Sequence, residues 1–236
     1  GNHGRAVAWV ARRLGLRAVV VMNDNAPAVK VDAVRGAGAH VVLVDRYLRV
    51  QTAEELAARE GLAMIPPFEH PHVILGQGTC AFEILEDHPE LSALLVPVGG
   101  GGLLAGSCLA AMALGHPVEL IGVEPEGAAK LSAALAAGHP VSLERTASIA
   151  DGLLPVAIGK LPWAQIEQRV HRALRISDEA IATALRFLFR HMGLRVEPSG
   201  AVAVAALLEG QLRPSGPTAV ILSGGNVDPA LFERLS

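Results

Sequence analysis

The chain has 236 residues and a formal net charge of −3, from 20 Lys and Arg against 23 Asp and Glu. Hydrophobic residues make up 51% of it and charged residues 18%, which excludes a disordered chain and allows a sizeable core. The balanced charge and an aromatic content of only 3% argue against a nucleic-acid partner. Two cysteines, Cys80 and Cys108, make no disulfide framework, so we expect a cytoplasmic protein.

Short β-branched runs alternate with longer helical patterns, as in βαβ units with parallel sheets. In the first third, helices are expected over residues 7–14, from Pro27 to residue 36, and from a capping box of Thr52 and Glu55. Strands are expected there over residues 17–22, 40–45 and 62–65. The double proline at residues 66–67 is a predicted domain boundary.

After this boundary the same alternation restarts. Strands are predicted over residues 93–98, 118–123, 171–176 and 219–222. Helices are predicted over residues 78–85, 103–114, 128–137, 163–169, 178–192, 199–208 and 229–235. Ser177 is the expected cap of the helix that begins at residue 178, because serine accepts hydrogen bonds from the first turn.

One uncharged stretch, from Leu91 to Val118, is long enough to cross a bilayer. Pro97 and four consecutive glycines interrupt it, and both would break a spanning helix. We therefore interpret it as a buried strand, a glycine turn and a buried helix, and we expect no membrane partner.

The four glycines, Gly99, Gly100, Gly101 and Gly102, are the most informative local signal and are called the tetraglycine turn below. They follow a predicted strand and open a predicted helix, so several bare N–H groups and a helix N-terminus can converge on one anion. A phosphate suits such a place, whereas close helix–strand packing is the structural alternative. The motif is neither a Walker loop nor a good dinucleotide fingerprint.

Other segments are weaker signals when taken alone. Ser223 follows the last predicted strand, where parallel sheets bind ligands, but an ordinary turn explains it equally well. Asn2, Glu124 and Glu197 each stand at a predicted helix start and need no further role. His70 and His72 suggest a metal only weakly, because no second cluster accompanies them.

Taken together, the segments resemble a known family. GNHGRAVA, APAVKVDAVRGAGA, GQGT, PVGGGGLLAG, GVEPEG, IADG, VEPSGA and ILSGGNVD occur in this order. They resemble the threonine dehydratase and serine racemase family of fold-type II pyridoxal-phosphate enzymes, over residues 1 to about 229. The resemblance implies an α/β fold of two three-layer domains with mostly parallel sheets, as in the tryptophan synthase β-like enzymes.

The resemblance also implies roles for individual residues. Gly99 to Gly102 would hold the phosphate of pyridoxal 5′-phosphate, and Ser223 would hydrogen-bond its pyridine nitrogen. Asn2 would contact the 3-oxygen of the cofactor, while the Asn2-His3-Gly4 backbone would bind the substrate carboxylate. Gly152 would lie near the substrate, and Glu197 near the cofactor.

The catalytic lysine of the family is the main departure. In relatives a lysine upstream of the GNHG segment forms the Schiff base with the cofactor and moves the proton at Cα. The three lysines of this chain, Lys30, Lys130 and Lys160, stand in other contexts, so we assign no catalytic residue. We expect the 236-residue chain alone to show little or no dehydratase activity.

A second departure concerns a metal. Relatives that bind a divalent cation use the glutamate of the VEP segment and an acidic residue a few positions later. Glu124 is therefore the candidate metal ligand, but Lys130 stands at the later position. We predict that the Lys130 ammonium takes the place of the cation, which an ordered Mg²⁺ on Glu124 would contradict.

By the same resemblance, residues 1–67 form a small substrate-binding domain with an incomplete N-terminus. Residues 68–236 form a large cofactor-binding domain that lacks an N-terminal contribution, and the enzyme is a homodimer or homotetramer. The predicted activity is conversion of L-threonine or L-serine, a small amino-acid substrate, to a 2-oxo acid and ammonia. The alternatives are a serine racemase, a truncated non-catalytic cofactor-binding chain and a nucleotide-binding α/β protein.

Overall fold

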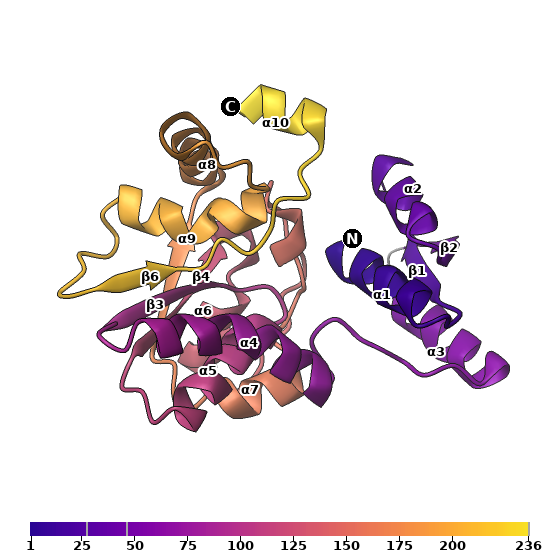
Figure 1. The fold of residues 1–236 in the computed structure, drawn as a ribbon, viewed down its shortest axis with the longest axis horizontal. Helices are drawn as coiled ribbons and strands as arrows, with labels where there is room; N and C mark the ends of the chain where they lie inside the picture. Colours follow the sequence, from indigo (N-terminus) through magenta and orange to yellow (C-terminus); the bar gives the residue numbers. More distant parts are fainter. Residues whose placement is uncertain (27, 46, 236) are drawn as a thin grey trace. The chain divides into compact units, whose positions relative to one another are not determined.

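The structure of the protein is a computed structural model that describes residues 1–26, 28–45 and 47–235. The chain divides into two compact units, Gly1–Pro66 and Pro67–Ser236 (Figure 1). Each unit contains only parallel strand pairs together with helices, among the residues so described. This confirms the α/β class with parallel sheets that the alternating pattern predicts.

The first unit is a two-stranded parallel sheet with its helices. Its elements are α1 (Asn2–Arg13), β1 (Val19–Asn23), α2 (Ala28–Gly36), β2 (His40–Val44) and α3 (Arg49–Glu60). The strands pair in register from Val19 opposite His40 to Asn23 opposite Val44. Its small core consists of the buried residues Ala8, Met22, Val31, Val34 and Ala39.

Three local expectations in this unit fail or lie outside the description. The capping box is wrong, because α3 is capped at Leu48 and the Thr52 N–H donates within the helix to the Leu48 carbonyl oxygen at 2.8 Å. The strand at 62–65 is wrong, because those residues pair with no strand among the described residues. Pro27, the expected first residue of α2, lies outside the described residues.

The second unit is organised around a four-stranded sheet in the order β5-β4-β3-β6. Its strands are β3 (Ala93–Pro97), β4 (Glu119–Pro125), β5 (Arg172–Ile176) and β6 (Thr218–Val220). Every residue of β3 is buried, which explains its continuous apolar run. Because all pairs are parallel, the carboxyl ends of β3 and β6 meet at one edge of the sheet.

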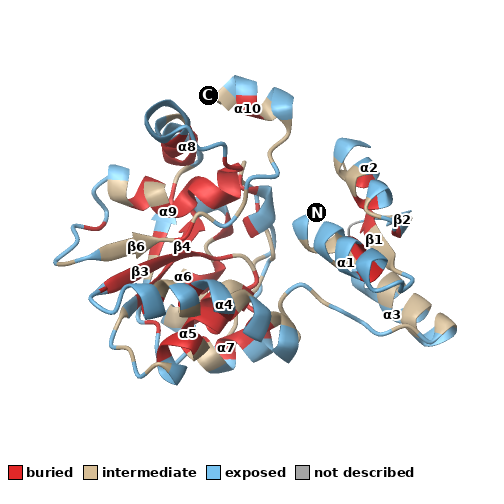
Figure 2. Ribbon diagram, viewed as in Figure 1, coloured by how far each residue is buried: buried red, intermediate tan, exposed pale blue. Residues whose placement is uncertain are grey.

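Helices cover both faces of this sheet (Figure 1), and the buried residues concentrate between the layers (Figure 2). They are α4 (Pro71–Asp87), α5 (Gly102–Ala113), α6 (Lys130–Ala137), α7 (Lys160–Ile166), α8 (Asp178–Met192), α9 (Pro198–Leu208) and α10 (Pro229–Leu235), with short 3₁₀ turns η1 (Glu126–Ala128) and η2 (Asp151–Leu153). Leu95 and Ile121 pack in one core with α8 and α9. Leu94 and Val96 pack in the other with α4, α5 and α7. The alternation of strand residues between two cores makes this unit three-layered.

Helices α4 and α5 approach closely enough for their backbones to touch. A Cβ built on Gly78 would lie 2.6 Å from the Gly106 carbonyl oxygen, and one on Gly106 would lie 2.5 Å from the Ile74 carbonyl oxygen. Only glycine fits both positions, since the obstacle on each side is backbone that cannot turn away. This contact fixes the direction of α5, whose first residue belongs to the tetraglycine turn.

Ser177 caps α8, as the sequence predicts, and its hydroxyl oxygen accepts a hydrogen bond from the Ala180 N–H at 3.2 Å. Replacing it by alanine leaves that N–H without its partner. We expect Ser177→Ala to lower the free energy of unfolding by about 1 kcal/mol, as measured by urea denaturation. The exposed Ser142, changed to alanine, is the control and should leave stability unaltered; equal stability of the two variants would contradict the capping role.

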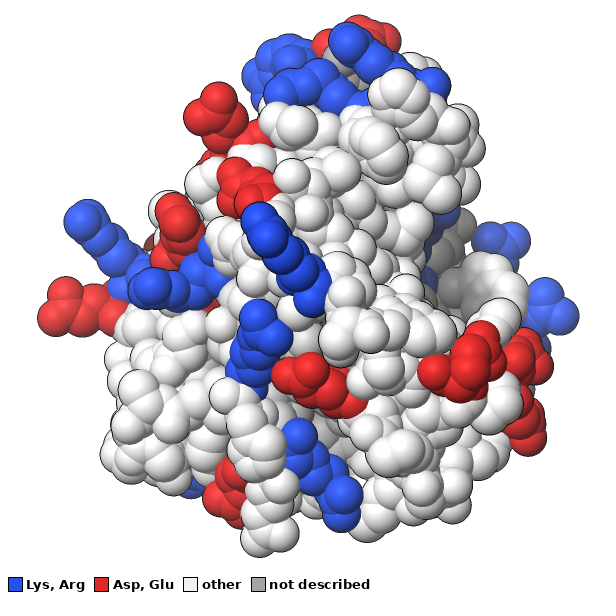
Figure 3. Space-filling model, turned by 90° about the vertical axis from the view of Figure 1, so that its left-hand side faces the viewer, with Lys and Arg blue, Asp and Glu red and all other residues white. Residues whose placement is uncertain are grey.

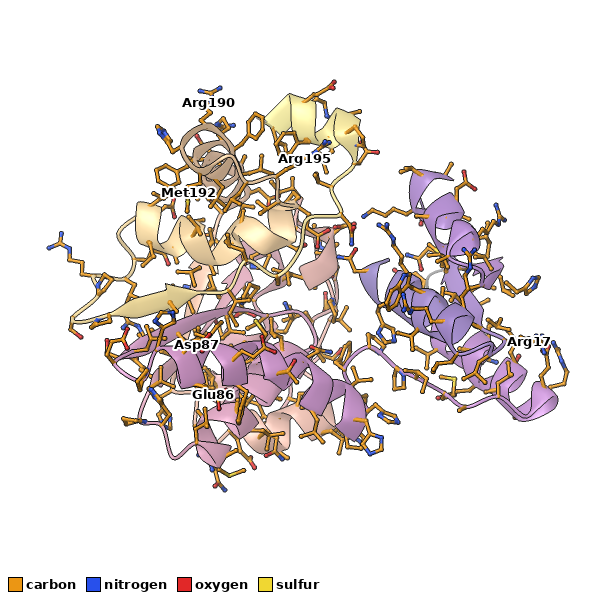
Figure 4. The ribbon with its side chains drawn as sticks, viewed as in Figure 1. Arg17, Glu86, Asp87, Arg190, Met192 and Arg195 are labelled. Carbon is orange, nitrogen blue, oxygen red and sulfur yellow. The ribbon has the colours of Figure 1, made fainter. Side chains whose placement is uncertain are left out.

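Helix α10 is held in the second unit by an aromatic contact with α8 and a cation–π contact with Arg195. Phe232 of α10 packs edge-to-face on Phe189 of α8 with centroids 5.0 Å apart. The Arg195 guanidinium lies 4.8 Å from the centre of the same ring, and its label stands beside α10 in Figure 4. These contacts bring the chain that follows β6 back over α8 and so restrain the segment containing Ser223.

Charges of both signs are interspersed over the face shown in Figure 3, and uncharged residues cover most of it. Among the described residues, no helix is long and apolar enough to cross a membrane. The uncharged stretch from Leu91 to Val118 is divided into β3, the tetraglycine turn and α5, as predicted. The alternative interpretation of that stretch as a membrane span is therefore rejected.

Candidate functional site

The tetraglycine turn lies at the carboxyl end of β3, whose residues are all buried, and leads directly into α5. Gly101 is the N-cap residue of α5 with φ 93°, a left-handed conformation that favours glycine. No side chain caps this helix among the described residues. Gly100, Gly101 and Gly102 are buried, and Gly99 is half-buried.

The backbone N–H groups of Gly99 to Leu103 donate to no acceptor among residues 1–26, 28–45 and 47–235. Buried N–H groups are almost always paired, so a cluster of unpaired ones marks a place where an acceptor outside the protein binds. An anion with several oxygens satisfies them together, and the N-terminus of α5 adds partial positive charge. The turn thus fits a phosphate group.

The other side of the turn is filled by protein, which explains why the positions are glycines. A Cβ on Gly100 would overlap the Phe68 ring, and one on Gly102 would lie 2.8 Å from Gln77 Oε1. On Gly101 it would lie 3.1 Å from side-chain atoms of Ile158 and Pro162. Close packing and anion binding are therefore compatible here, because the Cα side of the turn faces the protein while its N–H groups stay unpaired.

Gly152 lies next to the tetraglycine turn. Its carbonyl oxygen would be 3.1 Å from a Cβ on Gly99, and its N–H donates to Ser199 Oγ at 3.0 Å. Ser199 is buried in the first turn of α9, so its hydroxyl holds η2 in place within the core that Leu153 shares with α9. The structure thus brings Gly152 and the tetraglycine turn together, and Ser199 is a contributor that sequence reasoning missed.

Ser223 is exposed and lies just beyond β6, the strand next to β3. The segment that follows is packed against the start of α9, where the Glu197 N–H donates to the Gly224 carbonyl oxygen at 3.0 Å. Glu197 is buried, and a Cβ on Gly224 would overlap its carboxylate. Ser223 and Glu197 therefore lie at the same edge of the sheet as the tetraglycine turn.

Lys130 and Glu124 form a fully buried ion pair next to Val98, the residue that precedes the tetraglycine turn. Lys130 Nζ donates to the carbonyl oxygens of Val98 at 2.9 Å, Ala128 at 2.8 Å and Leu153 at 2.9 Å. It also lies 3.8 Å from Glu124 Oε2. Burial lowers the pKa of Lys130 to about 8, and the Glu124 carboxylate opposes this shift, so the ammonium is charged at neutral pH.

Glu124 is occupied by partners of its own. Its two oxygens accept hydrogen bonds from the N–H groups of Leu131 and Ser132, each at 2.8 Å, and thereby cap the start of α6. Within the described part of the chain, no group of three or more His, Cys, Asp or Glu side chains could hold a metal ion. The structure places the Lys130 ammonium beside Glu124, and the prediction that it takes the place of a cation stays a prediction.

Neither of the other two lysines is buried as Lys130 is. Lys160 is exposed at the start of α7, and Lys30 lies on α2 in the first unit. Cys108 is buried, and burial raises the pKa of its thiol to about 12, so it stays protonated and inert. Cys80 is exposed.

Asn2, His3 and Gly4 form the first turn of α1 in the first unit. His3 Nε2 hydrogen-bonds with the Ile65 carbonyl oxygen at 2.6 Å, which ties the start of the helix to the end of the unit. A Cβ on Gly4 would lie 2.7 Å from a Val20 methyl group, so α1 packs closely on β1 there. The structure places these three residues together at a helix N-terminus.

Comparison with known proteins agrees with this geometry. The family described as "Pyridoxal-phosphate dependent enzyme" matches residues 1–224. The chain is 42% identical to L-threo-3-hydroxyaspartate ammonia-lyase of Saccharomyces cerevisiae, over 100% of this chain and 73% of that protein. It is 40% identical to serine racemase of Schizosaccharomyces pombe, over 97% of this chain and 72% of that protein.

Two solved structures have the same fold as this chain. The solved structure of maize serine racemase superposes with a TM-score of 0.94 at 35% identity, covering 99% of this chain and 73% of that one. A threonine deaminase crystal structure superposes with a TM-score of 0.92 at 40% identity, covering 97% of this chain and 76% of that one. The family's cofactor, pyridoxal phosphate, carries the kind of anion that the unpaired N–H groups of the tetraglycine turn fit. The chain belongs to the pyridoxal-phosphate-dependent enzymes of fold type II, in the group that contains ammonia-lyases and racemases.

Proposed function

We propose that the protein is an ammonia-lyase that converts L-threonine or L-serine to a 2-oxo acid and ammonia. The observation that carries this proposal is the set of unpaired N–H groups at the buried tetraglycine turn, which provides a phosphate site at the sheet edge where Ser223 also lies. The similarity to a threonine deaminase and to a hydroxyaspartate ammonia-lyase supports elimination from a β-hydroxy amino acid.

In this proposal the residues of the second unit hold the cofactor. Gly99 to Gly102 donate backbone N–H groups to its phosphate, and the Ser223 hydroxyl hydrogen-bonds its pyridine nitrogen. When bound, pyridoxal phosphate withdraws electrons from Cα of the amino acid, so that the Cα proton and the β-hydroxyl can leave. A hydroxyl opposite the ring nitrogen, unlike a carboxylate, does not require a protonated ring, and this suits loss of a β-hydroxyl.

The first unit supplies substrate recognition in the proposal. The N–H groups in the first turn of α1, at Asn2, His3 and Gly4, favour a carboxylate, because the helix terminus carries partial positive charge. Asn2 additionally contacts the 3-oxygen of the cofactor. In the second unit, Gly152 lies near the substrate and Glu197 near the cofactor.

The proton at Cα needs a base that none of the three lysines supplies in this proposal. The Lys130 ammonium donates all three of its hydrogens to backbone carbonyl oxygens, so it is not available as the base. Lys160 is exposed at the start of α7 and stands outside the sequence context of the family's Schiff-base lysine, although the preceding Gly159 N–H donates to the Gly100 carbonyl oxygen at 3.0 Å. We therefore expect the base to be a lysine outside these 236 residues, and the tests of activity use the full-length gene product.

The first experiment incubates the full-length gene product and pyridoxal phosphate with L-threonine, L-serine and L-threo-3-hydroxyaspartate. We expect release of equal amounts of 2-oxo acid and ammonia from L-threonine or L-serine. Preference for L-threo-3-hydroxyaspartate would contradict the proposed substrates, L-threonine and L-serine, and identify hydroxyaspartate as the substrate instead. Binding of pyridoxal phosphate without turnover of any substrate would favour the non-catalytic alternative.

Serine racemase is the second candidate, and the 40% identity to the Schizosaccharomyces pombe protein favours it. The two activities differ in the fate of serine: a racemase returns D-serine, whereas an ammonia-lyase returns pyruvate and ammonia. Chiral chromatography of the serine that remains after incubation distinguishes them. D-Serine accumulation in excess of ammonia would make racemisation the main activity.

Ser223→Ala tests the proposed contact with the cofactor ring. Loss of one hydrogen bond should weaken pyridoxal-phosphate binding and lower kcat by up to about tenfold, with the circular dichroism spectrum unchanged. Ser215→Ala is the matched control, because Ser215 is exposed in the turn before β6, at the opposite edge of the sheet. Wild-type kinetics in Ser223→Ala would contradict the assigned role.

A further inference from the structure

The Lys130 side chain links segments that are distant in sequence. Its three carbonyl partners belong to Val98, which precedes the tetraglycine turn, to Ala128 at the end of η1, and to Leu153 at the end of η2. Val98 and Leu153 each adjoin a residue of the candidate site, Gly99 and Gly152 respectively. One ammonium therefore holds both turns that meet at the site.

Burying this ammonium completely is costly unless its donors are satisfied and its charge is balanced. Both conditions are met, because three carbonyl oxygens lie within 2.9 Å and a carboxylate oxygen lies at 3.8 Å. The reverse also holds: the three buried carbonyls and Glu124 need a cation. An aliphatic side chain at position 130 would leave this group of oxygens facing apolar atoms.

The carbonyl oxygen of Val98 belongs to the same peptide group as the Gly99 N–H. Its position sets the orientation of that peptide, since the carbonyl and the N–H belong to the same planar unit. The Leu153 carbonyl is held in the same way, one residue beyond the Gly152 peptide that touches Gly99. A shift of the ammonium would thus turn the first donor of the phosphate site.

We propose that Lys130 is a positioning residue, a cation built into the chain that aligns the tetraglycine turn for phosphate and makes added cations unnecessary. The proposal rests on the proposed function only in naming the turn as the phosphate site. Cutting the side chain back to alanine should leave a cavity lined by three carbonyl oxygens and one carboxylate. That cavity should accept a free ammonium ion in place of the lost one, because the donors and the charge are the same.

The first measurement uses the wild-type full-length protein. Its Tm and its affinity for pyridoxal phosphate, followed by fluorescence titration, should be the same in ammonium chloride, potassium chloride, magnesium chloride with matched ionic strength, and tetramethylammonium chloride with EDTA. A wild-type protein that requires one of these cations for cofactor binding would overturn the proposal.

The second measurement compares three variants. Lys130→Ala in tetramethylammonium chloride should bind pyridoxal phosphate at least about tenfold more weakly than wild type, because charge-assisted hydrogen bonds that fix the turn are lost. Ammonium chloride should restore most of this affinity, whereas tetramethylammonium, which donates no hydrogen bond, should not. Lys130→Met should lose affinity without rescue, since its side chain fills the space. Arg213→Met, at an exposed basic residue in the turn before β6, is the control and should behave as wild type.

Rescue by ammonium also tests whether Lys130→Ala needs a cation in order to fold. If Lys130→Ala does not fold in tetramethylammonium chloride, refolding in ammonium chloride should recover it, and failure in both salts would overturn the cation role. Wild-type affinity in Lys130→Ala without ammonium would also overturn it. Absence of pyridoxal-phosphate binding by the wild-type protein would instead reject the proposed function, and the Tm series of the variants would still report the cation site.

Discussion

Replacing Gly100 with alanine should weaken the binding of pyridoxal phosphate about a hundredfold. The new Cβ would overlap the Phe68 ring, so either the ring or the tetraglycine turn must move. The turn also contains Gly101 in a left-handed conformation and has little freedom to adjust. Misaligning two N–H donors to a charged acceptor costs about 3 kcal/mol or more, which corresponds to the expected loss. Titration of the full-length protein, followed by cofactor absorbance, measures it.

A second substitution shows whether the Phe68 ring is the cause. Phe68→Ala removes the overlapping atoms, so the double variant Gly100→Ala with Phe68→Ala should bind more tightly than Gly100→Ala alone. Far-ultraviolet circular dichroism confirms that each variant is folded. If Gly100→Ala binds pyridoxal phosphate as wild type does, the phosphate is bound elsewhere and the interpretation of the turn is wrong.

Replacing Gly106 with alanine should lower the free energy of unfolding of the second unit by about 3 kcal/mol. The added methyl group would lie 2.5 Å from the Gly78 nitrogen and from the Ile74 carbonyl oxygen, both in the backbone of α4. Separating α4 from α5 is the only relief, and it opens the core around Ile74, Ala81 and Leu104. Urea denaturation followed by the fluorescence of buried Trp163, which belongs to this core, measures the loss.

The matched control is a glycine of α4 itself. A Cβ on Gly76 would have nothing within 4 Å apart from the neighbouring backbone of its own helix, so Gly76→Ala meets no obstacle. Alanine is the better helix former, and we expect this variant to be more stable than wild type by about 0.5–1 kcal/mol. Equal stability of Gly106→Ala and Gly76→Ala would contradict the close approach of the two helices.

The sequence pattern predicted most of the second unit correctly. The helix over residues 178–192 with its Ser177 cap, the strands at β3, β4 and β5, and the final helix over 229–235 all occur at or within two residues of the predicted bounds. These elements carry strong local signals, namely apolar runs, helical periodicity and a capping serine. The first unit was predicted less well, because a Thr-x-x-Glu spacing also occurs inside helices and a short apolar run needs a neighbouring strand to pair with.

The sequence by itself determined the α/β class and the family, and it predicted the tetraglycine turn as an anion site, since hydrophobic periodicity, consecutive glycines and the order of the motifs can all be read along the chain. Only the tertiary structure decided which groups surround that turn. Phe68 above Gly100, Ser199 against Gly152, and Lys130 between Val98 and Leu153 are contacts between segments far apart in sequence. No spacing encodes them, because they depend on how the helices pack on the sheet and on which buried carbonyls are left in need of a donor.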